Sequence, residues 1–306
     1  MKKLVFCLTL CGFILAGCKK VEPEGDRQIV VFLTSQSVLS SLKSTTPATS
    51  TEGVINKVVL FGFENSGAFV TGSKWVITGT PDPLGEELTV SRKVKTIWAI
   101  ANPTQSMEEA EPANVTALKA TTVDFLTAPA SPFLMSGKGT VETFSATIKL
   151  YFTVAKVQIE SSDTDFRITS ITVQNTPNQG FVFDEDLFDA PPPPAVPVIP
   201  GGASRINYAQ VNHPALPAPP EPMIFYVAEN IAGNSTKFLV KGTLEGTPIT
   251  DYSLELKLGS AIPILRNTYY KVSIGPQGEG VGTIGLVIPE WGDEDTDDHE
   301  FEEEQP

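Results

Sequence analysis

The feature that most constrains the fold is a long run of alternating side chains near the middle of the chain, over residues 140–160. Apolar side chains recur at every second position there, first at Ile148, Leu150, Phe152 and Val154. This period of two predicts a β-strand with one buried face. The phase then shifts by one residue, which indicates either a β-bulge near residues 155–156 or a strand that leaves one sheet and enters another. We place a domain boundary at the start of this run, between residues 142 and 143.

Most other ordered segments also have the composition of strands, separated by Gly, Pro, Asn and Asp. One short helix is expected near residues 115–125, and residues 129–139 are expected to be a loop with a Met-Ser-Gly turn. Hydrophobic residues make up 41% of the chain, enough for packed cores. The sequence therefore predicts an all-β protein of two β-sandwich domains with at most one or two short helices. The expected strands are 28–33, 54–64, 74–78, 96–102, 223–227, 237–244, 252–258, 268–274 and 281–291.

The first residues have the pattern of an export signal. Lys2 and Lys3 precede an apolar run over 4–15, which is too short to span a bilayer. Two small residues then lead to Cys18, as in a bacterial lipoprotein signal. We expect residues 1–17 to be a signal peptide and Cys18 to be lipidated. The alternative is an ordinary signal peptide cut near the same place, with the cysteine incidental.

Charge and residue types exclude several classes of function. The net charge is −14, and ten acidic residues without Lys or Arg follow residue 289. An acidic chain without a basic stripe repels phosphate, so no nucleic-acid partner is expected. His213 and His299 are the only histidines, and no pair of thiols follows Cys18. We therefore expect no metal site, no cofactor and no catalytic triad, and the chain is not expected to be an enzyme.

These patterns divide the chain into five parts. Residues 18–43 are a polar tether and a first strand, followed from residue 35 by a Ser- and Thr-rich loop. Residues 44–142 and 143–292 are the two sandwiches, and 293–306 is a solvated acidic tail. Residues 189–222 hold eleven prolines and are expected to be a long surface loop. The alternative is a Pro-rich ligand for a recognition domain.

Six segments, in the same order along the chain, resemble the fimbrillin family, the subunits of Bacteroidales type V pili. The first is the lipoprotein signal with its early strand. One segment has the sequence Trp-Ala-Ile-Ala-Asn-Pro, and another has Arg-Asn-Thr-Tyr-Tyr-Lys-Val. The resemblance covers nearly the whole chain after the signal. The later segments are residues 98–103, 135–137 with 152–157, 225–230, 266–272 and 290–291.

The resemblance implies a fold and a way of assembling. Both domains would be transthyretin-like sandwiches, and a surface protease would remove the first strand. A strand of the next subunit would then fill the groove by β-augmentation. The resemblance implies that the plug side chains are Ile29, Val31 and Leu33, with Val30 and Phe32 on the other face. It implies donor side chains at Ile284, Leu286, Ile288 and Trp291.

The sequence departs from this family at the processing site, which is usually an Arg in the loop after the first strand. Here that loop has Lys43 and no Arg, while Arg27 precedes the strand. A cut at Lys43 would remove lipid and plug together, and a cut at Arg27 would leave the plug in place. Without a cut, the protein would stay attached to the outer membrane through Cys18.

The expected function is a structural pilus subunit, exported as a lipoprotein to the outer membrane and the fimbrium. It would polymerise with other fimbrial subunits by donor-strand exchange and support adhesion and biofilm formation. One alternative is a lipid-anchored anchor or tip subunit. Another is a monomeric surface lipoprotein that binds a glycan or a protein through aromatics around Trp75 or 181–188, although core packing would also explain those aromatics.

Overall fold

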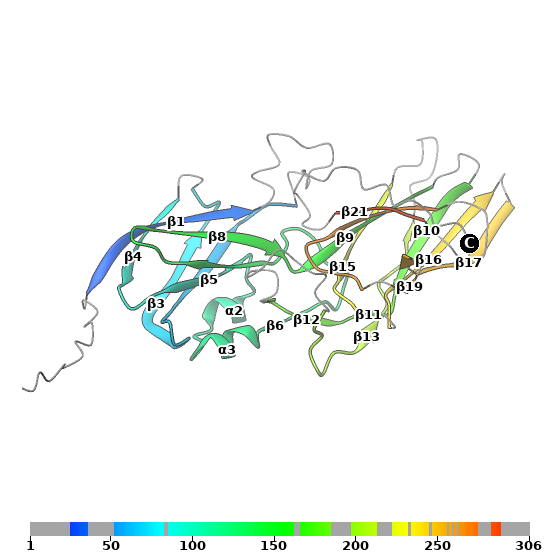
Figure 1. Ribbon diagram of the computed structural model, residues 1–306. Helices are drawn as coiled ribbons and strands as arrows, with labels where there is room; N and C mark the ends of the chain where they lie inside the picture. The colour runs from blue at the N-terminus through cyan, green and yellow to red at the C-terminus, as the bar shows by residue number, and fades with distance from the viewer. Residues whose placement is uncertain are drawn as a thin grey trace, which may run out of the picture.

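The computed structural model describes residues 25–35, 52–82, 85–161, 166–184, 197–212, 222–231, 234–244, 247–255, 257–258, 260–261, 263–274 and 283–288. Within these ranges the chain is mostly strand, with two short helices. Two β-sandwich domains lie end to end (Figure 1). The predicted all-β fold class is confirmed. None of the helices in the described part of the chain is long and apolar enough to cross a membrane.

The first domain is one seven-stranded sheet with the order β3-β2-β5-β7-β8-β1-β4. The outermost strands, β3 and β4, contact each other, so the sheet closes around a single core. Every strand of this sheet contributes apolar side chains to that core. The strands are β1 (Asp26–Ser35), β2 (Lys57–Phe63), β3 (Phe69–Thr78), β4 (Glu86–Ser91), β5 (Thr96–Ala101), β7 (Met135–Thr140) and β8 (Ser145–Phe152).

Two short helices, α2 (Gln105–Glu109) and α3 (Val115–Lys119), cover the outer face of β2 and β5. Each begins at a capping residue: Thr104 accepts a hydrogen bond from the amide of Met107, and Asn114 accepts one from the amide of Ala117. The helix expected over 115–125 is therefore shorter than predicted. It gives way to β6 (Thr122–Asp124), which pairs with β12 (Gln179–Phe181).

The second domain is a sandwich of two four-stranded sheets, with the orders β14-β10-β16-β17 and β15-β9-β20-β21. Val157, Ile171, Phe225, Phe238 and Val272 come from both sheets and share one core. The strands are β9 (Val154–Ser161), β10 (Phe166–Gln174), β14 (Val211–Asn212), β15 (Met223–Ala228), β16 (Lys237–Leu244), β17 (Thr247–Glu255), β20 (Tyr269–Ile274) and β21 (Thr283–Ile288). The short strands β11 (Thr176–Pro177), β13 (Arg205–Ile206), β18 (Lys257–Leu258) and β19 (Ser260–Ala261) complete the set.

The chain passes from one domain to the other between β8 and β9, which Thr153 alone separates. Side chains up to Val154 lie in the first core, whereas Ala155 and Val157 lie in the second. The shift of phase therefore marks a strand that leaves one sheet and enters another. The change of sheet falls later than the boundary expected at 142/143, because β8 stays in the first sheet between β7 and β1.

The loop expected over residues 129–139 is wrong in its last part, because β7 begins at Met135 and runs through the glycines. A Cβ atom at Gly137 would lie 2.2 Å from the carbonyl oxygen of Lys149, and one at Gly139 would lie 2.4 Å from that of Thr147. These glycines allow the backbone of β8 to approach closely and do not form a turn.

Candidate functional site

The first strand occupies an interior position in the seven-stranded sheet (Figure 1). Its first half, from Asp26 to Val31, pairs antiparallel with β4. Its second half, from Val30 to Ser35, pairs in parallel with β8. The two ladders overlap only at Val30 and Val31. β1 therefore lies between β4 and β8 and pairs with both of them. Removing β1 would leave a slot with unpaired backbone groups on both sides.

The side chains of β1 alternate between the core and the outer face. Ile29 and Val31 are 1% and 0% exposed, and Leu33 is half-buried against the same core. Val30 and Phe32 are half-buried on the opposite face. Burial of an aliphatic side chain contributes about 1.5–3 kcal/mol, so the two fully buried residues stabilise the seated strand by about 3–6 kcal/mol. An empty slot would therefore favour another apolar strand.

Arg27 is built into the start of this strand. Its backbone lies opposite Val90, and its Nη2 donates to the carbonyl of Val94 at 3.3 Å. The amide of Arg92 donates to the carbonyl of Gly25 at 3.0 Å. A protease that cuts at Arg27 must first open this end of the ladder, because its substrate is bound as an extended, unpaired segment.

A buried ion pair involves Glu52, the first described residue after residues 36–51. Lys156 Nζ on β9 lies 2.9 Å from Glu52 Oε1 and 3.1 Å from Oε2. The hydroxyl of Tyr226 on β15 donates to the same carboxylate. Burial raises the pKa of Tyr226, and the hydrogen bond to Glu52 and the negative charge of that carboxylate add to the shift. Glu52 thus binds two strands of the second domain, β9 and β15.

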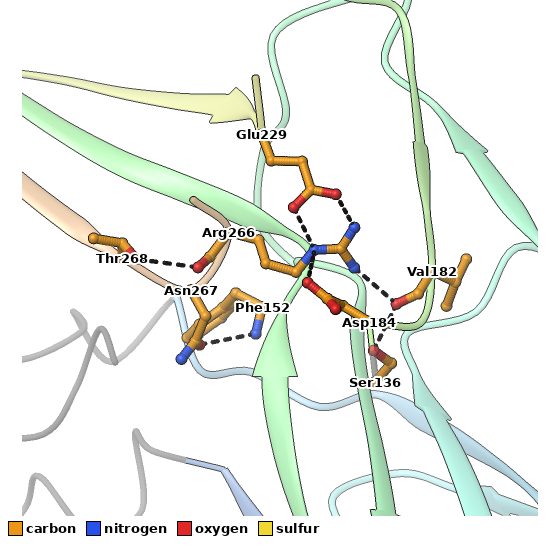
Figure 2. Close-up of polar contacts among 8 residues, drawn as sticks. All are labelled: Ser136, Phe152, Val182, Asp184, Glu229, Arg266, Asn267 and Thr268. Carbon is orange, nitrogen blue, oxygen red and sulfur yellow. Dashed lines mark hydrogen bonds and ion pairs between the residues drawn. The ribbon is translucent and has the colours of Figure 1, made fainter. Parts of the chain in front are cut away.

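A second buried ion pair lies at the same junction (Figure 2). Arg266 binds Glu229 with two hydrogen bonds, of which the one from Nε to Oε2 is 2.9 Å. Its Nη1 donates to the carbonyl of Val182 at 3.2 Å, and Ser136 on β7 donates to that carbonyl at 2.6 Å. Burial opposes the charged form of Arg266, but the charges of Glu229 and Asp184 outweigh it, so the pKa of Arg266 is raised.

Asn267 binds the backbone at the point where the chain passes from the first domain to the second. Its side-chain oxygen accepts from the amide of Phe152 at 3.0 Å (Figure 2), and its own amide donates to the carbonyl of Val154 at 2.8 Å. Its φ of +55° lies in the left-handed region, which asparagine tolerates better than most residues. The backbone on both sides of Thr153 is therefore fixed by one residue of the second domain, through its side chain on one side and its backbone amide on the other.

The structure does not bring the two halves of the expected exchange site together within one chain. The candidate donor residues Ile284, Leu286 and Ile288 are part of β21, which pairs with β20 at the edge of the second domain. β1 lies in the other domain. The lipidation candidate Cys18, the processing candidate Lys43 and the donor candidate Trp291 lie outside the described residues. Contact between β1's slot and a strand like β21 would have to be between chains.

The aromatics proposed for ligand binding are engaged in packing where the structure describes them. Trp75 is half-buried against the first core. Phe183 is buried edge-on to Trp98, with ring centroids 5.2 Å apart. In the described part of the chain, no three His, Cys, Asp or Glu residues gather as a metal site.

Sequence reasoning missed the two ion pairs. Glu229 and Arg266 both lie in segments that resemble the family, but nothing in the sequence indicated that they pair. Lys156 is a charged residue between the apolar residues Ala155 and Val157, and this is the one available signal.

The fold and its first strand define a two-domain β-sandwich protein that is completed by a strand at its N-terminus. A family model described as major fimbrial subunit protein (FimA) matches residues 30–182, from β1 to the end of β12. This is half of the chain, and the chain belongs to that family. The resemblance found in the sequence is confirmed. The family consists of fimbrial structural proteins and not of enzymes. No curated protein matches the chain.

Solved structures with the same fold are distant in sequence. A protein described as a cell adhesion protein from Parabacteroides distasonis has a TM-score of 0.58 at 16% identity, covering 84% of this chain and 90% of that chain. The tip fimbrial protein Mfa3 from Porphyromonas gingivalis, with a C-terminal truncation, has a TM-score of 0.58 at 13% identity, covering 87% and 100%. A cell adhesion protein from Bacteroides eggerthii has a TM-score of 0.52 at 17% identity, covering 82% and 87%.

Proposed function

We propose that this chain is a pilus subunit that is exported as a lipoprotein and polymerises by strand exchange. The observation that carries the proposal is the position of β1, which lies between β8 and the outermost strand β4 and buries Ile29 and Val31 in the core. Its only covalent link to the body of the chain is residues 36–51. β1 would complete the subunit during export and would be removed at the cell surface. A strand of the next subunit would then take its place.

Lys43 is the processing position that we favour. Arg27 is held in the ladder with β4, so a cut there would require part of β1 to open first. A cut at Lys43 would release β1 together with the lipid on Cys18. Glu52 would remain on the body, where its bonds to Lys156 and Tyr226 keep the new start of the chain at the domain junction.

β21 is the donor strand that we propose for this chain. It lies at the edge of its sheet and has one partner, β20, with a register shift between Lys271 and Val272. A strand with a single irregular ladder is released more easily than one between two partners. Ile284, Leu286 and Ile288 repeat the spacing of Ile29, Val31 and Leu33. The acidic tail would stay hydrated outside the groove.

Adhesion and biofilm formation follow from polymerisation in this proposal. A pilus repeats each surface of its subunits many times, so weak contacts with another cell or a host surface add up through multivalency. Before processing, the lipid on Cys18 would hold the subunit at the outer membrane. After processing, other fimbrial subunits would be its partners.

N-terminal sequencing of pili sheared from the cell surface tests this proposal. We expect the mature chain to begin at Ser44, and Lys43→Ala to abolish that start. Arg27→Ala is the matched control and should leave it unchanged. Labelled palmitate should enter the precursor and not its Cys18→Ala variant. Assembled pili that retain a lipidated Cys18 would contradict processing and favour an anchor subunit.

A further inference from the structure

The outer face of β1 packs against the backbone of Gly85. A Cβ atom at this glycine would lie 2.4 Å from Val30 Cγ1 and 3.0 Å from Phe32 Cε1. Real Cβ atoms do not approach other atoms so closely, so any other residue here would push on the first strand. Gly85 also has a φ of +98°, which side chains rarely adopt.

Local hydrogen bonds place Gly85 at this position. Its amide donates to the carbonyl of Asp82 at 2.9 Å, and the amide of Asp82 donates to the carboxylate of Glu86, also at 2.9 Å. Glu86 begins β4 opposite Val31 of the first strand. By contrast, Gly72 has a φ of +78° with nothing within 4 Å of a Cβ. Gly85 therefore combines backbone freedom with close contact to β1.

We infer that Gly85 makes the slot selective for strands that are apolar on both faces. This inference rests on the proposed strand exchange. We define the outer seat as the Gly85 backbone together with the positions next to it that Val30 and Phe32 occupy. One branched and one aromatic side chain fill this outer seat. A partner strand must supply large apolar residues at these two outer positions as well as at the inner positions of Ile29 and Val31.

The chain's own β21 matches the inner face of β1 but not its outer face. With Ile284, Leu286 and Ile288 facing inward, its outer residues are Gly285 and Val287. Gly285 has no side chain to replace that of Val30, so the apolar contacts of Val30 would be lost. The slot therefore favours an extended segment of a different subunit, apolar on both faces, over β21 of a second copy. In this inference β21 is donated to a different subunit, and a different subunit fills the slot of this chain.

The test uses the intact, unprocessed chain, in which β1 occupies the outer seat. Substitutions in β1 therefore show how much the contacts of this seat contribute to stability. Val30→Gly gives β1 the outer residue that β21 would bring, and the melting temperature of the first domain is measured by calorimetry. We expect a loss of roughly 2–6 °C. In the Gly85→Ala background this loss should shrink to about half or less, because the added Cβ occupies the vacated place.

Gly72→Ala is the matched control, because it also places a side chain at a positive φ but makes no contact with β1. In that background Val30→Gly should cost as much as in the parent chain. Val30→Ala, which also removes Cγ1 but keeps a side chain, should give the same ranking. An equal loss in all three backgrounds would overturn the inference. The result does not depend on processing or polymerisation. A failure of the proposed strand exchange and a failure of the inference about Gly85 can therefore be told apart.

Discussion

Glu52 and Lys156 form a buried ion pair across the join of the two domains, although 104 positions separate them in the chain. The pair lies directly after residues 36–51, the segment in which we propose that the chain is cut. The described chain that follows this segment is therefore attached to the second domain at its first residue, Glu52. Loss of β1 would leave this attachment intact.

Breaking this pair on one side should be costly. Glu52→Ala removes the carboxylate that faces Lys156, which is only 2% exposed, and we expect a loss of about 3–5 kcal/mol in the free energy of unfolding. The double variant Glu52→Gln with Lys156→Met should recover most of that loss, because no buried charge remains. Lys57→Ala, which breaks a surface pair with Glu108, should cost less than about 1 kcal/mol. Denaturant unfolding measures all three, and similar small losses would contradict the assignment.

Arg266→Lys keeps the positive charge but loses the two-pronged contact with Glu229 and the bond to Val182. We expect a loss of about 1.5–3 kcal/mol in the free energy of unfolding. Hydrogen exchange at the amides of residues 182–184 should become faster, because Arg266 holds this segment on the second domain. Lys271→Ala removes the half-exposed pair with Glu160 and serves as control. If both variants exchange alike, Arg266 does not fix the junction.

The alternation along β1 predicts losses of stability of different size at neighbouring positions. Ile29→Ala removes a fully buried side chain and should cost about 2–5 kcal/mol. Gln28→Ala removes an exposed side chain with one hydrogen bond to Thr89 and should cost less than about 1.5 kcal/mol. Thermal or denaturant unfolding of the unprocessed chain gives both values. A reversed order would mean that β1 is seated in another register.

Alkaline pH should destabilise the second domain through Tyr270. Burial raises the pKa of Tyr270 to about 12 from the ordinary value of 10.0. The folded state keeps this proton when the unfolded state has lost it. Stability is thus fully present below pH 10 and falls by about 2–3 kcal/mol as pH rises to 12. Tyr270→Phe, which is less stable at neutral pH because Leu265 loses its acceptor, should show a flatter decline. Equal slopes for both proteins would exclude Tyr270 as the group that titrates.

Local patterns predicted strands well where one face is buried. The period of two in β1 and in β8 reflects a core on one side, so residues such as Val31 and Leu150 could be placed from sequence. The shift of phase before Val157 likewise follows from a second core on the other side of the chain. Both signals depend only on neighbours in sequence.

Features that depend on distant neighbours could not be predicted. The sequence around Gly137 predicts a turn, because the carbonyl of Lys149 that requires a glycine there belongs to another strand. Gly85 gave no signal, since its importance comes from Val30, which lies in the first strand. The pairing of Glu229 with Arg266 also requires the fold, because each charge alone is typical of a solvent-exposed residue.

In the proposed strand exchange, β1 leaves its slot before a subunit enters the pilus, and a reversible disulfide between β1 and β8 would prevent this step. Val31 and Ala146 are register partners on β1 and β8, so Val31→Cys with Ala146→Cys should form a disulfide between these strands. We expect the oxidised double variant to be exported but absent from sheared pili, and reductant to restore its incorporation. Each single variant is the control. Incorporation of the oxidised chain at the level of the unmodified protein would contradict strand exchange at this slot.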